Sequence, residues 1–171
     1  MNLTSLIASK GRLAELAVGL TATNFIGYAF DYLLYPFVIY QFGILTGGTI
    51  MAAASFTACI TGMKFYDWSK RDWIGIEAIK EIKTYKGTRR IGHVTSWVLT
   101  KSEPVVFLFL SIKFDPFVTT AYMRHGKFNG MNRRDWTIFM GSLLVSNVYW
   151  TIASYMGISV VEAAWKAIVK G

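Results

Sequence analysis

Residues 102–126 read Ser-Glu-Pro-Val-Val-Phe-Leu-Phe-Leu-Ser-Ile-Lys-Phe-Asp-Pro-Phe-Val-Thr-Thr-Ala-Tyr-Met-Arg-His-Gly. Two apolar runs, Pro104–Ile112 and Phe117–Met123, lie on either side of the string Lys113-Phe114-Asp115-Pro116. A helix needs roughly 20 apolar residues to cross a bilayer, so neither run is long enough alone and the two together are. The stretch therefore predicts a membrane segment with an unusual centre.

The centre of this segment holds a proline and two opposite charges. Proline lacks an N–H and clashes with the preceding turn, so Pro116 predicts a break or kink in the helix. Charges at membrane depth are costly and usually pair with a partner or mark a pathway. Lys113 and Asp115 are therefore the first candidate functional residues, and one of them could pair with a charge on another segment.

The composition of the whole chain fits a small membrane protein. Of its 171 residues, 53% are hydrophobic and 16% aromatic, and the mean hydropathy is +0.38. Ordinary soluble domains are less apolar and more charged than this. The length predicts one all-α membrane domain over residues 1–171, with three transmembrane helices and the proline-broken segment.

The spans follow from the uncharged stretches. Residues 32–63 carry no charge and are too long for one crossing, so the chain must fold back at 41–43 or 46–48, where glycine relaxes the backbone. We expect spans near 16–40, 46–65 and 137–158. Asp135 is expected to cap the third span and Gly157 to end it.

Several polar residues lie inside these predicted spans. Asn24 and Asn147 are expected to form hydrogen bonds between helices or to line a pathway. Pro36 predicts a tolerated kink near the outer end of the first span. Asp31 lies among aromatic residues in mid-span, where it either holds helices together as a protonated or tyrosine-bonded carboxyl or forms an ion or proton site.

Small residues share one face of the second span. Gly48, Ala52, Ser55, Cys59 and Gly62 recur at spacings of four, three, four and three. Such a face lets another helix backbone approach closely. The partner helix could belong to the same subunit or to a neighbouring one.

Residues 66–103 form a basic loop with interleaved acids. Ser69-Lys70-Arg71-Asp72 has a capping-box pattern, and Trp73 opens an amphipathic helix expected to lie in the headgroup plane. Ser159–Glu162 shows a second capping box, which predicts a short interfacial helix at the C-terminal end. The residues expected to contact anionic headgroups or partners are Lys70, Arg71, Trp73, Arg124, His125, Arg133, Arg134 and Trp136. The interleaved acids argue against nucleic-acid binding.

The distribution of basic residues predicts the orientation. Loop 64–103 holds nine Lys and Arg residues and the turn near 41–48 holds none, so the N-terminus and this loop are expected in the cytoplasm of a bacterial-type inner membrane. If residues 104–123 cross, four basic residues in 124–135 lie on the wrong side. If residues 104–123 re-enter, only Lys166 and Lys170 lie on the wrong side. The charge count favours re-entry, with the C-terminus outside, whereas the total apolar length favours a fourth crossing, with the C-terminus inside.

Three functions are compatible with the sequence. The first is a channel or transporter component whose path is lined by Asp31, Lys113 and Asp115. The second is a non-catalytic subunit or scaffold, which would dock partners through the small-residue face and the basic amphipathic loop, either as a homo-oligomer or as part of a membrane complex. The third, and weakest, is a lipid-headgroup enzyme in which Arg124, His125, Arg133 and Arg134 hold phosphate. No nucleotide loop, nucleophile elbow or paired-cysteine motif is present, so we expect no metal or cofactor, and a non-catalytic role is favoured over an enzyme.

Overall fold

The structure is a computed structural model, and it describes residues 21, 25–73, 76, 102–124, 128 and 130–170. This described part is helical and contains no strand, which confirms the all-α class. Its elements are η1 (Phe30–Leu34), α2 (Tyr35–Ser69), α5 (Glu103–Lys113), α6 (Pro116–Met123) and α7 (Arg133–Lys170). Asn24, His125 and the amphipathic helix expected after Trp73 lie outside the described residues.

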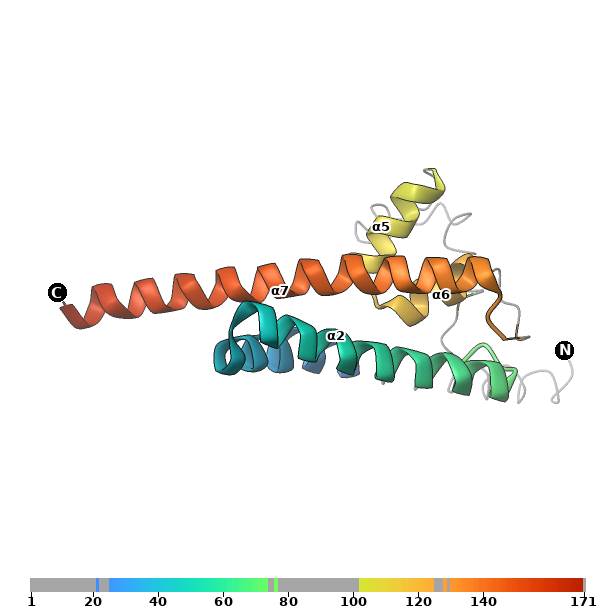
Figure 1. The fold of residues 1–171 in the computed structure, drawn as a ribbon, viewed down its shortest axis with the longest axis horizontal. Helices are drawn as coiled ribbons and strands as arrows, with labels where there is room; N and C mark the ends of the chain where they lie inside the picture. Colours follow the sequence, from blue (N-terminus) through green and yellow to red (C-terminus); the bar gives the residue numbers. More distant parts are fainter. Residues whose placement is uncertain are drawn as a thin grey trace, which may run out of the picture.

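The first helical segment folds back on itself at Gly43. This residue has φ 75° and ψ 172°, a conformation open to glycine and strained for other residues. Beyond the turn, a Cβ on Gly47 would lie only 3.0 Å from the Cα of Ile39 and the carbonyl oxygen of Val38. The two arms of α2 therefore lie side by side, as Figure 1 shows. The predicted fold-back is confirmed, at the earlier of the two expected turns.

The helix widens just before Pro36 instead of ending there. Residues 30–34 form a π-helical turn, in which the Tyr35 N–H donates to the Phe30 carbonyl. Such turns are rare and frequently lie at functional sites. The kink expected at Pro36 therefore takes the form of a π turn on its N-terminal side, and this turn carries Asp31.

The segment quoted at the outset is broken where the sequence predicts. Helix α5 ends at Lys113 and α6 begins at Pro116. The Asp115 carboxylate accepts a hydrogen bond of 2.7 Å from the Val118 N–H and so caps α6. With 11 and 8 residues, neither helix is long enough to cross a bilayer alone.

Both ends of this broken segment contact the start of α7. Arg134 lies 3.9 Å from Glu103, the first residue of α5. Arg124, which follows α6, lies 3.4 Å from Asp135. The chain between residues 103 and 124 therefore leaves the charged end of α7 and returns to it.

Helix α7 is longer than expected. The side chain of Asn132 accepts from the Asp135 N–H at 2.9 Å, and the Asp135 carboxylate accepts from the Asn132 N–H at 3.1 Å. The cap is therefore Asn132, with Asp135 as its reciprocal partner. The predicted end at Gly157 and the separate C-terminal helix are wrong. A glycine inside a helix costs only about 1 kcal/mol, and α7 continues through it to Lys170.

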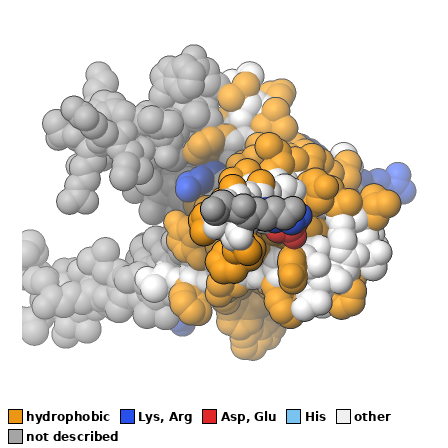
Figure 2. Space-filling view, turned by 90° about the vertical axis from the view of Figure 1, so that its left-hand side faces the viewer, with side chains coloured by type: hydrophobic (Ala, Val, Ile, Leu, Met, Phe, Trp, Pro, Cys, Tyr) orange, Lys and Arg blue, Asp and Glu red, His pale blue; other side chains and the backbone are white. Residues whose placement is uncertain are grey.

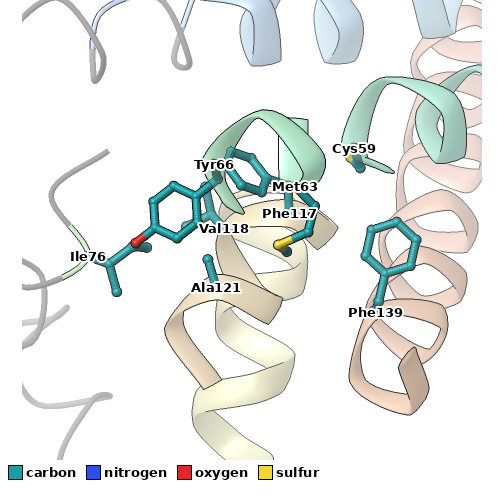
Figure 3. Close-up of a cluster of buried hydrophobic side chains, with 8 residues drawn as sticks. All are labelled: Cys59, Met63, Tyr66, Ile76, Phe117, Val118, Ala121 and Phe139. Carbon is teal, nitrogen blue, oxygen red and sulfur yellow. The ribbon is translucent and has the colours of Figure 1, made fainter. Parts of the chain in front are cut away.

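The helices meet in an aromatic core near this charged end (Figure 3). Its buried members include Met63 and Tyr66 from α2, Phe117 from α6 and Phe139 from α7. The small-residue face packs within the same chain, because a Cβ on Gly62 would lie 3.4 Å from the Phe117 ring and one on Gly48 3.2 Å from Thr151. At these two positions the face therefore contacts helices of the same chain.

The loop after α2 begins differently from the prediction. Ser69 is the last residue of α2 and its hydroxyl donates to the Tyr66 carbonyl, so it does not open a new helix. Asp72 instead accepts from the Ile76 N–H at 2.8 Å. Lys70, in the left-handed conformation with φ 50°, makes the turn between them.

Two helical stretches are long and apolar enough to cross a membrane, Phe25–Ser69 and Arg133–Val169. Most of their apolar side chains point outward. Figure 2 looks at the molecule from the end where α7 finishes, and apolar side chains cover most of the described surface in that view. The exposed set on α7 includes Leu144, Met156, Val160, Val161, Trp165 and Ile168.

Candidate functional site

A cavity of about 230 Å³ lies where the hairpin, the broken segment and α7 meet. Asp31 comes from the π turn, Lys113 from the end of α5, and Asp115 from the link between α5 and α6. The second arm of α2 contributes Ser55 and Cys59, and α7 contributes Ser146. The structure therefore brings together three of the five predicted pathway residues, from segments far apart in the sequence.

Asp115 is held in place by the break that it helps to form. The backbone leaves α5 in an extended conformation at Asp115, and one carboxylate oxygen is used to cap α6. The side chain is half-buried beside Pro116. A carboxylate fixed this way keeps its position without a cation.

Asp31 has a different environment. It is half-buried, and within the described part of the chain it makes no hydrogen bond or ion pair. It is close enough to Asp115 for the two carboxylates to interact electrostatically. Among the described residues no tyrosine forms the expected hydrogen bond with Asp31, and the nearby Tyr35 hydroxyl donates to Asn147 instead.

Lys113 lines the cavity but its side chain is exposed. Among the described residues it forms no ion pair with Asp31 or Asp115, so the salt bridge expected across segments is absent there. A lysine can place its stem along an apolar wall while its ammonium remains at the rim. The lining thus carries two carboxyl groups and one lysine side chain.

Asn147 does not line this cavity. It accepts a short hydrogen bond from the Tyr35 hydroxyl and donates to the Leu143 carbonyl at 2.7 Å. Both residues are buried, and Tyr35 also packs near Trp150. Asn147 therefore joins α7 to the first arm of α2, a structural bond between helices.

Arg124 is buried, contrary to the headgroup contact expected for it. Its side chain is 2% exposed, and its guanidinium lies 3.1 Å from Asp67 and 3.4 Å from Asp135. It also donates to the Gly130 carbonyl at 2.8 Å. A planar guanidinium can serve several acceptors at once, so Arg124 ties the end of α2 to the end of α6 and the start of α7. We call Arg124, Asp67 and Asp135 the Arg124 cluster.

The remaining predicted surface residues divide into two groups. Lys70, Arg71, Arg133, Arg134 and Trp136 are exposed near the Arg124 cluster. Trp73 is instead half-buried, with its ring packed on Phe65, Tyr66 and Phe117. Trp73 therefore belongs to the core and to the cavity lining, which corrects the interfacial role expected for it.

The sequence reasoning missed the aromatic walls of the cavity and the partners of Arg124. The charged residues have aromatic neighbours in the sequence, namely Phe30, Phe114 and Phe117. This adjacency was the signal that could have predicted aromatic walls. Asp67 and Asp135 gave only a weak signal, as acids close to helix ends. No cluster of potential metal ligands exists in the described ranges. No protein-family model, curated protein or solved structure matches the chain.

Proposed function

We propose that the chain is a small multi-pass membrane protein acting as a channel or transporter component, with Asp31, Lys113 and Asp115 along its solute path. One observation carries the proposal, which is that three charged residues from distant segments line one cavity between apolar helices. Charged groups inside a membrane protein are costly and tend to mark substrate or ion pathways.

The depth of the cavity supports this assignment. Ser146, in its lining, follows Arg133 by 13 residues, which at 1.5 Å per residue places it about 20 Å along α7. Cys59 precedes Asp67 by eight residues, about 12 Å along α2. If the Arg124 cluster lies at the headgroups, the cavity lies inside the hydrocarbon core, which is about 30 Å thick.

The fold suggests three crossings and one re-entrant segment. Since the first helical stretch folds back at Gly43, its two arms would cross in opposite directions and α7 would cross a third time. Residues 103–124 would dip in and return, because both of their ends contact the start of α7. Broken backbone at membrane depth is tolerated when it lines a cavity, as it does here.

The distribution of basic residues supports one orientation of this arrangement in the membrane. Exposed basic residues gather where α2 ends and α7 begins, namely Lys64, Lys70, Arg71, Arg133 and Arg134. The hairpin turn around Gly43 has no charged residue. By the positive-inside rule, the side where α2 ends and α7 begins would face the cytoplasm, and the C-terminal end of α7 would lie outside.

A membrane subunit or scaffold is the second candidate, and the last turns of α7 favour it. Val160, Val161, Trp165 and Ile168 are all more than 60% exposed. A second copy or another membrane protein would cover such a surface. A headgroup enzyme built on Arg124 has no comparable support, since its guanidinium is already engaged by Asp67 and Asp135.

Sidedness labelling tests the proposed topology. In a Cys59→Ser background, single cysteines at Glu103, Arg133 and Leu45, all exposed positions, are treated with an impermeant maleimide in oriented vesicles. Positions 103 and 133 should label from one side and position 45 from the other. Labelling of 103 and 133 from opposite sides would show that residues 104–123 cross.

Solute flux tests the proposed function. Proteoliposomes containing the wild-type protein should move at least one solute from a panel of protons, potassium, choline, chloride and phosphate faster than protein-free vesicles. The panel covers both charge signs because the lining carries both. If no solute moves while the folded protein still assembles with itself or a partner, the subunit role replaces the transport role.

A further inference from the structure

We propose that the cavity binds a small organic cation, an ammonium compound of about the size of choline. This inference rests on the proposed function and names the solute class for the same site. It follows from the charge of the lining, the nature of its walls and its volume.

The charge of the lining favours a cation. Asp31 and Asp115 both line the cavity, and among the described residues neither carboxyl group forms an ion pair. Burying an unpaired charge is costly, and a bound cation would supply the missing partner. Lys113, the basic residue of the lining, is exposed, so its ammonium can remain at the rim and leave the two carboxyl groups free for a cation.

The walls of the cavity favour an organic cation over a hydrated metal ion. Its aromatic residues are Tyr28, Phe30, Tyr35, Trp73, Phe114 and Phe117. The face of an aromatic ring attracts cations through its quadrupole, and cages of such rings recognise quaternary ammonium groups. A metal ion would instead need several oxygen ligands, and the described residues contain no metal-binding cluster.

The volume sets the size of the ligand. A cavity of about 150 Å³ in another protein accepts benzene, so about 230 Å³ accommodates a molecule somewhat larger than benzene. Choline combines a quaternary ammonium with a short hydroxyethyl arm and is a suitable probe. Its neutral analogue 3,3-dimethylbutan-1-ol has nearly the same shape without the charge.

Binding to the purified full chain in detergent micelles, measured by isothermal titration calorimetry, tests this inference. Choline should bind saturably and 3,3-dimethylbutan-1-ol should not. Asp31→Asn and Asp115→Asn should each weaken choline binding by about tenfold or more, the scale expected for loss of one buried charge partner. Asparagine at 115 still offers an oxygen to the Val118 N–H, so the cap of α6 is kept.

Two further variants make the test specific to charge at the cavity. Lys113→Met should tighten choline binding, because it removes the competing positive charge from the lining. Glu103→Gln should leave choline binding unchanged, because Glu103 is an exposed carboxylate outside the cavity. A merely structural effect would not make Lys113→Met and Asp115→Asn act in opposite directions.

The outcomes separate this inference from the transport proposal. Absence of choline binding by the folded protein, equal binding of the neutral analogue, or weaker binding in Lys113→Met would each overturn the organic-cation assignment. If another solute still moves through proteoliposomes in those cases, the membrane path stands with a different solute. If nothing binds and nothing moves, both proposals fail.

Discussion

Replacing Arg124 with methionine should destabilise the protein by about 3–5 kcal/mol, the cost of leaving buried charges without their partner. The guanidinium is 2% exposed and lies between Asp67 and Asp135, whose side chains are 17% and 9% exposed. Without it two carboxylates would face each other in the core, at the point where α2, α6 and α7 meet. The drop should appear as a lower midpoint of thermal unfolding in detergent.

Arg134→Met is the matched control for this variant. Arg134 also pairs with a carboxylate, but both side chains are largely exposed and the atoms are 3.9 Å apart. Exposed pairs contribute roughly 0–1 kcal/mol, so the unfolding midpoint should barely move. Adding Asp67→Asn and Asp135→Asn to Arg124→Met should recover part of the loss, because it removes the unpaired charges. Equal effects of Arg124→Met and Arg134→Met would refute the proposed role of the Arg124 cluster.

The main features of the fold could be predicted because each depends on local chemistry. Pro116 cannot continue a helix, and α5 and α6 separate there. The uncharged stretch 32–63 is too long for a single crossing and must turn, and Gly43 is where it does. In the first case proline forbids a continuous helix, and in the second glycine permits a turn that other residues disfavour.

The end of α7 could not be predicted in the same way. Gly157 and Ser159 allow a helix end without enforcing one, and α7 continues through both. Helix boundaries set by weak preferences depend on the rest of the chain. The cap at Asn132 was missed for a similar reason, since Asn132 and Asp135 are both capable of capping.

The candidate site likewise contains residues that the sequence predicts and contacts that it does not. Asp31, Lys113 and Asp115 stood out because charges in apolar stretches are unusual, and the structure places all three around one cavity. Arg124 lies in a basic connector, which predicts an exposed side chain, but the structure buries it. Its burial depends on two acids from other segments, Asp67 and Asp135, and sequence spacing does not reveal such contacts.

Asp115→Asn should remove most of the solute flux and leave the fold intact. The substitution keeps the cap of α6 and removes one of the two carboxyl groups in the cavity. Loss of a buried charge partner of the solute should slow transport by about tenfold or more, a change of about 1.4 kcal/mol or more in the interaction. Glu103→Gln removes an exposed carboxylate outside the cavity and should transport as the wild type does.

The most direct test of the membrane path is therefore a comparison of efflux from proteoliposomes containing equal amounts of wild-type, Asp115→Asn and Glu103→Gln protein. The path described here predicts flux in the wild type and in Glu103→Gln, with a loss of about tenfold or more in Asp115→Asn. Wild-type flux in Asp115→Asn would contradict it, because the cavity would then have no part in moving the solute.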